Sequence, residues 1–485
     1  MNLQDTIVAP ATGNVVSAIG VIRMSGQRAL DIANEVFVPF NKRKMMFNNS
    51  QAMFKDIAKA NTLYFGTIYK EEKIVDEVVV SVFKAPHSFT GEDTIEISHH
   101  GSLFIRQEIL QLLIDKGARM ADKGEFSMRA FLNGKMNLSQ AEAVADLIQS
   151  GNVSSHDLAI NQLRGGYNEE LKALREKFLK IASLLELEID FSEEHEVFVD
   201  RKDLISQLDI ARQRLEMLVS TFSQGNAFRK GVPVAIAGKP NSGKSTLMNA
   251  ILKDNRSIVS AIEGTTRDTV EETINVNDIT VRFIDTAGIR QSDNEIEQEG
   301  IKRSFQAIQR AEVVLYLVDS SLDDMASIDY QLKFLQQEID CDSETTNNEI
   351  ESINLKDKKV ILVINKEDIS NLSVKDKDTL KNKGAVFISA KNSQGIEDIF
   401  DAITKDFVAS DVNSKVFVSN IRHYNALNNA LKEVIEARRA ALDGISSDLI
   451  SENIRGAMHH IGTITGEITD TDILNNIFDK FCIGK

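Results

Sequence analysis

At 485 residues the chain is long enough for two to four domains, and its 42% hydrophobic and 26% charged residues are typical of soluble proteins. No apolar run approaches the roughly 20 residues of a membrane span, the N-terminus lacks the pattern of a signal peptide, and two cysteines argue against a disulfide framework. The net charge of −16 disfavours a protein that holds RNA chiefly through a basic surface. An RNA substrate would need a local basic patch or a partner protein.

Residues 1–120 mix short strand and helix patterns and indicate an α+β domain. Apolar stretches at 5–12 and 17–26 predict strands around glycine turns. The alternation in residues 72–86 is typical of a strand at the edge of a pair. Residues 101–117 predict an amphipathic helix that ends at a glycine.

Residues 121–225 are dominated by helical patterns. Residues 139–190 contain few glycines and repeat apolar side chains at i, i+3, i+4 and i+7 over many turns. A second helical stretch covers 202–225. It leads directly into an apolar, β-branched run at 232–238, so the character of the chain changes there from helical to α/β.

The sequence GKPNSGKS, residues 238–245, matches the phosphate-binding pattern G-x-x-x-x-G-K-[ST]. An apolar strand precedes it and helical spacing follows it, which is the context that such a loop requires. Backbone N–H groups and the helix N-terminus would hold phosphate oxygens. We expect Lys244 to neutralise the β- and γ-phosphates and Ser245 to bind Mg²⁺.

Two later segments would complete the phosphate site. DTAG at 285–288 ends an apolar strand, which places Asp285 where a metal-linked carboxylate belongs and the Gly288 N–H near the γ-phosphate. Residues 260–269 lie where the first switch region of a GTPase falls. Thr266 would add a second hydroxyl to Mg²⁺ and respond to the γ-phosphate.

Two motifs specify the base. NKED at 365–368 ends another apolar strand, and Asp368 can accept hydrogen bonds from both N–H groups on the guanine edge. Adenine would leave that carboxylate poorly paired. SAK at 389–391 follows a further apolar strand pattern, residues 385–389, and supplies a backbone contact to the base carbonyl. The order and context of these motifs predict a GTPase domain.

The group that orients the attacking water does not follow from these motifs. Ras-like enzymes place a glutamine directly after DTAG, whereas this chain has Ile289, which cannot position water. The segment that follows offers three carboxylates, and the residues alone do not choose among them: Glu295, Glu297 and Glu299.

Helical patterns return in residues 409–485, after the α/β unit. Helical sequence on both sides of a self-contained α/β unit indicates an insertion. The predicted fold is therefore an α/β P-loop GTPase domain inserted into an all-helical domain, with an N-terminal α+β domain. The polar, acidic segment 341–358 is expected to be a surface loop.

With these residues in view, the chain resembles the MnmE (TrmE) family of tRNA-modification GTPases over essentially its full length. The resemblance implies an N-terminal tetrahydrofolate-binding and dimerisation domain at 1–120, a helical domain in two parts at 121–225 and 409–485, and a Ras-like G domain at 226–408. Lys123 departs from the family, in which a proline is expected. The motifs that carry the resemblance are GVIRMSG, SFTGEDTIEI, GEFSMRAFLNGKMNLSQAEAVADLI, GKPNSGKST, EGTTRD, DTAGIR and the closing FCIGK.

The resemblance implies a folate site. The family's folate-contacting positions match Arg23, Glu96, Lys135 and Lys485. Cations suit the glutamate carboxylates of a folate, and a carboxylate suits the donor edge of its pterin. The bound form is left open between 5-formyl- and 5,10-methylene-tetrahydrofolate. Cys482 is either a nucleophile near the folate or a small packing residue.

For the nucleotide the resemblance implies GTP, Mg²⁺ and K⁺. The potassium ligands fall on Asn241, Ser260, the backbone of Ile262, and Thr265, where the ion would neutralise charge between the β- and γ-phosphates. Glu297 matches the family's water-orienting glutamate and joins Lys244 and Thr266 as the expected catalytic residues. The full set expected around the nucleotide is Asn241, Ser242, Gly243, Lys244, Ser245, Thr246, Ser260, Ala261, Ile262, Glu263, Gly264, Thr265, Thr266, Asp285, Thr286, Ala287, Gly288, Asn365, Lys366, Asp368, Ser389, Ala390 and Lys391.

The resemblance further implies a cytoplasmic homodimer that forms a heterotetramer with the FAD protein MnmG and has no membrane partner. Together they would install a (carboxymethyl)aminomethyl group on carbon 5 of the wobble uridine of certain tRNAs. Two alternatives stay open. One is a ribosome-assembly GTPase that binds rRNA, although such proteins usually carry a basic module after the G domain. The other is a folate-binding regulator that only senses GTP.

Overall fold

The structure is a computed structural model that divides the chain into two compact units, described separately below. The first comprises residues 1–145, 162–204 and 432–485, and the second comprises 146–161 and 205–431. The residues that the structure describes are 5–40, 54–190, 200–254, 271–284, 306–337, 358–407, 416–469, 474, 477–479, 481 and 484.

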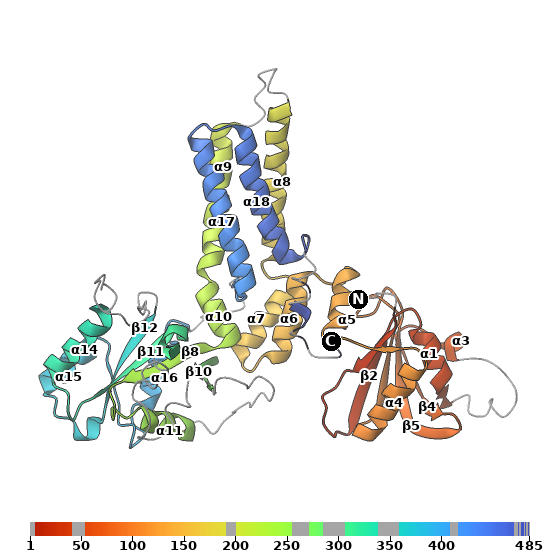
Figure 1. Ribbon diagram of the computed structural model, residues 1–485, viewed down its shortest axis with the longest axis horizontal. Coiled ribbons are helices and arrows are strands. Elements are labelled where there is room, and N and C mark those ends of the chain that lie inside the picture. The colour runs from red at the N-terminus through yellow and green to blue at the C-terminus, as the bar shows by residue number, and fades with distance from the viewer. Residues whose placement is uncertain are drawn as a thin grey trace, which may run out of the picture. The chain divides into compact units, whose positions relative to one another are not determined.

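A seven-stranded sheet forms the centre of the N-terminal domain in the first unit (Figure 1). Its strand order is β3-β4-β5-β6-β2-β1-β7, and every pair is antiparallel except β1 with β7. Residues 72–86, predicted as a strand at the edge of a pair, contain β5. This strand instead lies inside the sheet, because it pairs with β4 on one side and with β6 on the other. The strands are β1 (Ile7–Pro10), β2 (Ile19–Ser25), β3 (Phe37–Pro39), β4 (Thr62–Lys70), β5 (Lys73–Phe83), β6 (Thr94–His100) and β7 (Arg119–Met120).

Helices pack on both faces of this sheet. Alternate residues of the strands, such as Ile22 and Val80, form one core with helices α1 (Ala29–Val36), α3 (Phe54–Ile57) and α4 (Leu103–Asp115). On the opposite face, Phe126 of α5 (Glu125–Leu132) packs against Ile7 and Ala9 of β1. The second face is therefore covered over β1 by α5.

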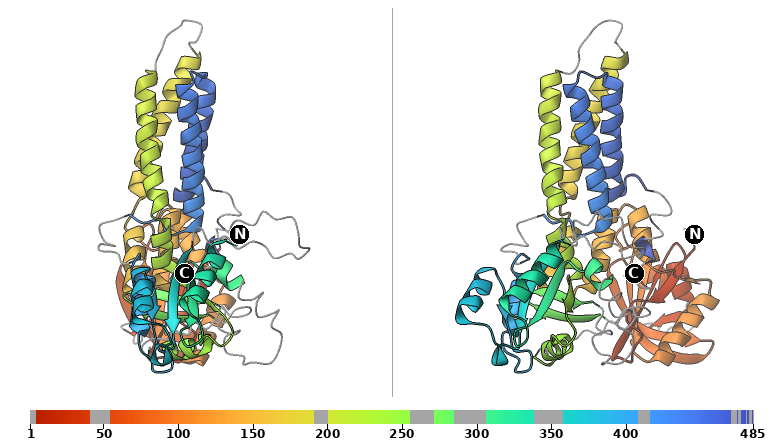
Figure 2. Two further views of the ribbon diagram at one scale, coloured as in Figure 1. Left: turned by 90° about the vertical axis from the view of Figure 1, so that its left-hand side faces the viewer. Right: turned by 60° about the vertical axis from the view of Figure 1, so that its left-hand side comes forward.

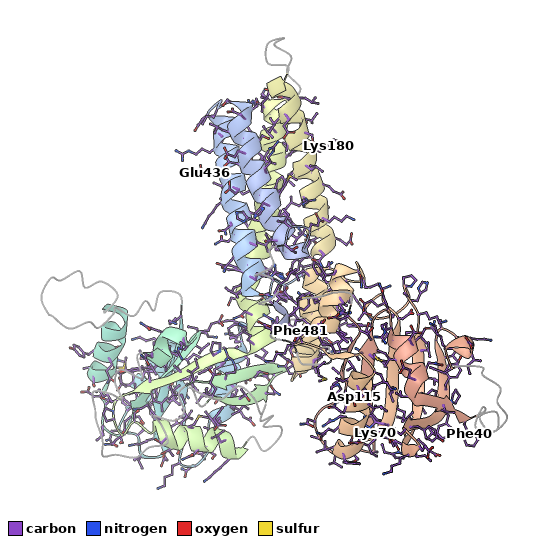
Figure 3. The ribbon with its side chains drawn as sticks, turned by 45° about the vertical axis from the view of Figure 1, so that its right-hand side comes forward. Phe40, Lys70, Asp115, Lys180, Glu436 and Phe481 are labelled. Carbon is purple, nitrogen blue, oxygen red and sulfur yellow. The ribbon has the colours of Figure 1, made fainter. Side chains whose placement is uncertain are left out.

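The helical part of the first unit contains α8 (Asn168–Asp190) and α18 (Ser447–Thr465), which lie side by side (Figures 1 and 2). Buried residues of α8 recur at helical spacing, including Leu171, Leu174 and Phe178. Lys180 and Glu436 project outward from their helices in Figure 3. Four further helices have residues in both units: α6 (Leu138–Gln149), α7 (Val153–Leu163), α9 (Arg201–Ser220) and α17 (Ile421–Leu442).

A six-stranded sheet of order β13-β12-β11-β8-β10-β9 forms the α/β domain of the second unit. All neighbouring strands are parallel except β9 and β10. The strands are β8 (Val232–Gly238), β9 (Glu272–Val276), β10 (Ile279–Phe283), β11 (Val313–Asp319), β12 (Lys359–Asn365) and β13 (Val386–Phe387).

Helices cover both faces of this second sheet. Apolar residues of α10 (Phe222–Lys230), α11 (Lys244–Asp254) and α16 (Ile396–Thr404) share one core with the strands. Residues of α14 (Met325–Gln337) and α15 (Val374–Asn382) pack on the other face. The result is the three-layer arrangement expected for a mostly parallel sheet.

The chain order confirms the predicted fold class. Helix α8 precedes the α/β domain in the sequence and α18 follows it, yet the two pack together, so the α/β domain is an insertion. Two local predictions were too simple. The strand expected over 385–389 has only two residues, and the stretch 202–225 contains two helices, α9 and α10. Among the described residues, none of the helices combines the length and the apolar composition that a bilayer span requires.

Candidate functional site

The predicted nucleotide motifs gather at one edge of the second sheet. Strands β8, β11, β12 and β13 run parallel, so their carboxyl ends lie at the same edge. The phosphate loop follows β8, NKED follows β12 and SAK follows β13. This edge is where open α/β sheets bind ligands.

Two glycines allow the phosphate loop its close contacts. Gly238 has φ +146°, and a Cβ there would lie 2.4 Å from the Leu317 carbonyl oxygen. Gly243 has φ +99°, and a Cβ there would lie 2.2 Å from Nδ2 of Asn365. Asn241, between them, also has a left-handed backbone, which asparagine tolerates better than most residues. The first and sixth positions of the motif therefore require glycine.

Lys244 begins α11 and turns its side chain back over the loop. Its Nζ donates to the carbonyl oxygens of Gly238 and Lys239, each at 2.9 Å. Burial lowers the pKa of the Lys244 ammonium. An anionic phosphate beside this nitrogen would favour its charged form, so the environment fits a phosphate-binding lysine. Ser245 and Thr246, the next residues, are exposed.

Asn365 of NKED joins the phosphate loop to the SAK segment. Its Nδ2 donates to the Ser242 carbonyl oxygen at 2.8 Å, and its Oδ1 accepts from the Ala390 N–H at 3.1 Å. The side chain is buried, so removing either partner would leave a costly unpaired group. Ser242 Oγ is also buried, and it finds no hydrogen-bond partner within the described chain. The structure thus brings three of the predicted motifs into direct contact.

The predicted base-recognition carboxylate is accessible. Asp368 is exposed and lies in the short 3-10 helix η3 (Glu367–Ile369), where its Oδ1 accepts from Ser389 Oγ at 2.7 Å. Lys366 has a left-handed backbone, and its Nζ lies 2.5 Å from Oδ2 of Asp319. Lys391 is exposed beside Ser389. We missed Asp319 in the sequence, although an aspartate that ends an apolar parallel strand is a recognisable signal.

Several predicted site residues lie outside the described residues, and their roles stay predictions. They comprise the first switch region, the DTAG motif, the water-orienting glutamate and the terminal lysine. These residues are Ser260, Ala261, Ile262, Glu263, Gly264, Thr265, Thr266, Asp285, Thr286, Ala287, Gly288, Glu297 and Lys485.

In the N-terminal domain, Arg23 and Glu96 face each other across β2 and β6 as register partners. Nε and Nη2 of Arg23 both lie 2.8 Å from Oε1 of Glu96. The guanidinium also lies 5.3 Å from the ring centroid of Phe89 and 5.8 Å from that of Phe126. The two predicted folate residues therefore form one half-buried ion pair on an aromatic support, which the sequence did not reveal.

Lys135 contacts the same loop that supplies Phe89. Its Nζ donates to the Pro86 carbonyl oxygen at 2.8 Å, and its side chain lies against Gly91. Near the end of the chain, Gly484 is buried with φ +96°, and a Cβ there would lie 2.0 Å from the Pro10 carbonyl oxygen. Ala9, which precedes Pro10 on β1, is the register partner of Arg23. The described residues thus place Gly484 against the strand next to the ion pair.

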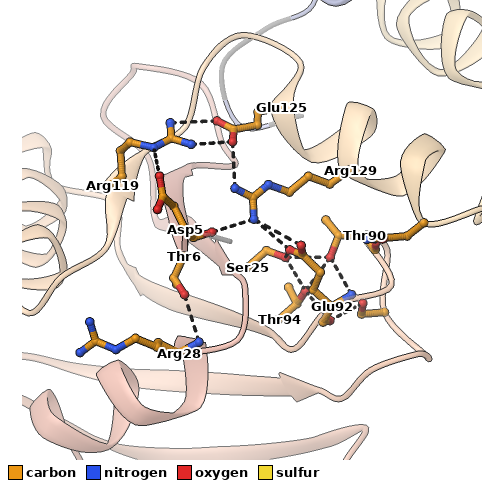
Figure 4. Close-up of polar contacts among 12 residues, drawn as sticks. Asp5, Thr6, Ser25, Arg28, Thr90, Glu92, Thr94, Arg119, Glu125 and Arg129 are labelled. Carbon is orange, nitrogen blue, oxygen red and sulfur yellow. Dashed lines mark hydrogen bonds and ion pairs between the residues drawn. The ribbon is translucent and has the colours of Figure 1, made fainter. Parts of the chain in front are cut away.

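A buried ionic network supports this region and was not foreseen (Figure 4). Arg119 binds both carboxylate oxygens of Glu125, at 3.1 and 2.7 Å. Arg129, 1% exposed, donates to Glu125 at 2.9 Å, to Glu92 at 3.2 Å and to the backbone of Asp5 at 2.8 Å. Burial opposes the charge of Glu125, but bonds from Arg119, the Asp122 N–H and Arg129 hold the pKa of its carboxyl below its usual range.

A phosphate loop, a parallel sheet and a guanine-type motif at its carboxyl edge define a P-loop nucleotide-binding protein of the GTPase class. Two family models match the chain. The model described as the GTP-binding protein TrmE N-terminus matches residues 6–135, and the MnmE helical domain matches residues 138–482.

Full-length relatives agree with this match. The tRNA modification GTPase MnmE of Christiangramia forsetii is 45% identical and covers 100% of both chains. The proteins of the same name from Flavobacterium johnsoniae and Bacteroides thetaiotaomicron are 45% and 44% identical over 99% of this chain and 99% and 100% of their own. A crystal structure of the G domain of the T. maritima FeoB iron transporter is 21% identical with a TM-score of 0.24, over 36% of this chain and 97% of its own. This chain belongs to the MnmE (TrmE) family.

Proposed function

We propose that this protein is a GTP hydrolase that takes part in tRNA modification. The single observation that carries the proposal is the double contact of Asn365 with the phosphate loop and the SAK segment, which brings together three motifs of the proposed guanine-nucleotide site. The relatives' shared name, tRNA modification GTPase, supports the biological role. The boundaries 1–120, 121–225, 226–408 and 409–485 belong to the proposal as its domain division.

In the nucleotide site, Lys244 would hold the β- and γ-phosphates. Ser245 and Thr246, exposed at the start of α11, would bind phosphate oxygens through their backbone N–H groups. The hydroxyl groups of Ser245 and Thr266 would hold Mg²⁺, and the carboxylate of Asp285 would interact with the same ion. Asp368 would accept from the guanine N1–H and amino group. We assign water orientation to Glu297, which leaves Lys244 and Thr266 to stabilise the charge of the transition state.

Asn241, Ser260, the backbone of Ile262, and Thr265 would hold K⁺. The left-handed backbone of the exposed Asn241 supports this assignment, because it sets the residue within the phosphate loop without burying its amide oxygen. A bound K⁺ would offset charge that grows between the β- and γ-phosphates, the role of an arginine in other GTPases.

The test is GTP turnover in equal concentrations of KCl and NaCl. We expect turnover to be at least tenfold faster in potassium, which corresponds to about 1.4 kcal/mol of barrier. Asn241→Ala should reduce the potassium effect, while Asp329→Asn, at an exposed surface pair in the same unit, should retain it. Equal turnover in the two salts would rule out potassium dependence without affecting the assignment of GTP hydrolysis.

The N-terminal domain would bind a reduced folate, 5-formyl- or 5,10-methylene-tetrahydrofolate, through Arg23, Glu96, Lys135 and Lys485. The aromatic support under Arg23 and the proximity of Lys135 to the same loop favour this location. Arg23 uses two of its nitrogens on Glu96, so other donors remain for a ligand carboxylate. Isothermal titration with 5-formyl-tetrahydrofolate should show binding that Arg23→Ala abolishes.

An exposed apolar patch supports a homodimer formed through the N-terminal domains. Leu63 and Phe65 project from the same side of β4, and they are 68% and 50% exposed. Phe40, labelled in Figure 3, lies with its ring centroid 5.7 Å from that of Phe65. Such grouped apolar side chains mark interfaces. Phe65→Glu should convert a dimer to a monomer in sedimentation velocity.

The wider role is the modification of carbon 5 of the wobble uridine in certain tRNAs, with an MnmG-type FAD protein in a cytoplasmic heterotetramer. The net charge of this protein is acidic, which disfavours extensive contact with tRNA phosphates and supports a partner that supplies much of the tRNA contact. Mass analysis of wobble uridines in a deletion strain is decisive. Loss of the (carboxymethyl)aminomethyl group is expected, whereas normal uridines with immature ribosomes would support the rRNA-binding alternative instead.

A further inference from the structure

We propose that Asp319 is a positioning residue for guanine recognition. By anchoring Lys366, its carboxylate holds the 365–368 turn in the shape that presents Asp368 to the base. This inference rests on the proposed role of Asp368 and adds a residue outside the five nucleotide motifs predicted from the sequence.

Asp319 stands at the right place in the sheet to do this. It ends β11 and is the register partner of Asn365, which ends β12. Its Oδ2 lies 2.5 Å from Nζ of Lys366. Its Oδ1 accepts from the N–H of Ser321 at 3.0 Å and from the Ser321 hydroxyl at 2.6 Å. The carboxylate is thus oriented on one side by Ser321 and presented to the lysine on the other.

The Asp319 carboxylate favours its charged form in spite of its burial. Asp319 is 5% exposed, and burial alone would favour its neutral form. Hydrogen bonds from Lys366 and Ser321 outweigh that effect and hold the pKa of the carboxyl below its usual range. Among the described residues, Lys366 is the one cation paired with this buried carboxylate, and breaking such a pair is costly because it leaves an uncompensated charge.

The backbone of Lys366 explains why an anchor is needed. Its φ of 62° and ψ of 39° lie in the left-handed region, which a side chain with a Cβ disfavours. The preceding carbonyl, that of Asn365, accepts from the N–H of Ser320 at 3.1 Å and from its hydroxyl at 2.8 Å. The turn is therefore held at two successive residues by the segment that follows β11. Asp368 comes two residues later.

A purely mechanical role would be to join β11 to β12. These strands are already paired along seven register positions, and Ser320 adds two bonds at their end. The ion pair additionally fixes the position of the Lys366 side chain and thereby holds the backbone of this residue in its strained, left-handed conformation. Loss of Asp319 should release this strain and displace Asp368.

The experiment compares GDP with IDP, which lacks the 2-amino group that Asp368 would read. In the full-length protein, Asp319→Asn should weaken GDP binding about tenfold and IDP binding much less, so the preference for GDP falls. The matched control is Asp146→Asn, which breaks another half-buried ion pair of the same unit, with Arg229 at 2.7 Å. It should leave both affinities unchanged. An unaltered preference in Asp319→Asn, with only a lower melting temperature, would overturn the inference.

A second variant tests the conformational cause. Glycine adopts positive φ at little cost, so Lys366→Gly removes both the strain and the need for an anchor. In that background, Asp319→Asn should change the GDP-to-IDP preference no further. The same loss in both backgrounds would mean that Asp319 acts independently of Lys366, against the inference.

Asp368→Ala separates this inference from the function on which it rests. If Asp368→Ala leaves the preference for GDP over IDP intact, the proposed guanine site is wrong. If Asp368→Ala abolishes the preference while Asp319→Asn does not, the site stands and only the positioning role fails.

Discussion

The two candidate sites of this molecule are built in different ways. The nucleotide site consists of short, contiguous motifs that each follow a parallel strand, and backbone groups carry many of its contacts. The site in the N-terminal domain consists of side chains from distant positions, such as Arg23 and Glu96, which are 73 residues apart. Sequence motifs describe a site of the first kind well, whereas a site of the second kind depends on the tertiary fold.

The largest effect is expected from the ionic network of the N-terminal domain. Glu125 is fully buried between Arg119 and Arg129. Glu125→Ala leaves two cations without their shared carboxylate, so we expect the free energy of unfolding to fall by about 3–5 kcal/mol. Urea unfolding followed by circular dichroism measures it. Glu35→Ala, at an exposed pair with Lys116, is the control and should cost less than about 1 kcal/mol.

In the nucleotide site, substitution should have its largest effect at glycines whose backbone leaves no room for a side chain. Gly243→Ala places a Cβ within 2.2 Å of Asn365 Nδ2 and forces alanine to φ +99°. We expect GDP affinity to fall by about 30-fold, or about 2 kcal/mol, because the loop and Asn365 must separate. Gly384→Ala is a useful comparison: its φ is +84°, but no atom lies within 4 Å of an added Cβ. Equal GDP affinity in Gly243→Ala and the parent would show that the loop does not need the Asn365 contact.

Acidification should lower the stability of the N-terminal domain through His99. His99 is buried in the N-terminal sheet, its ring lies against Gly20, and burial lowers its pKa. The folded state then resists protonation more than the unfolded chain does. The stability contributed by neutral His99 is present above about pH 6.5 and is lost as the pH falls through the lower folded-state pKa.

The measurement is urea unfolding of the parent and of His99→Phe at pH 7.5 and pH 5.5. His99→Phe should lose less stability on acidification than the parent, because phenylalanine retains an aromatic ring and cannot take up a proton. An equal loss in both proteins would assign the acid sensitivity to other groups.

The smallest effect is expected at the surface of the α/β domain. Lys383 and Asp329 form a pair at 2.9 Å with both side chains substantially exposed. Solvent and salt screen such a pair, so Asp329→Asn should change the free energy of unfolding by less than about 0.5 kcal/mol. Thermal unfolding at low and high salt measures it, and a loss above 1 kcal/mol would show that exposed pairs in this domain are coupled to its core.

These differences explain what could be predicted from the sequence. The strand–loop–helix context of Lys244, the position of Asn365 at the end of a strand and that of Asp368 just after it follow from local patterns, and so does the insertion of the α/β domain. The burial of β5 inside its sheet could not be predicted, because alternation does not reveal how many neighbours a strand has. The two-residue length of β13 is likewise set by tertiary pairing.

The ionic contacts were beyond sequence reasoning for a related reason. Arginines are mostly exposed in proteins, and only the fold brings Arg129 to Glu92 and to the backbone of Asp5. Arg23 was expected to contact a ligand, but its pairing with Glu96 and its aromatic support depend on β2–β6 register and on the placement of α5.

The most direct test of the account is the base specificity of Asp368→Asn. The aspartate accepts from the N–H donors of guanine, whereas asparagine can accept one bond and donate another, which matches the N1–H and C2 carbonyl of xanthine. We predict that the variant binds XDP at least 100-fold more tightly than GDP, a difference of about 2.7 kcal/mol, while the parent shows the reverse order. An Asp368→Asn protein that still prefers GDP would contradict the assignment of this edge of the sheet as a guanine-nucleotide site.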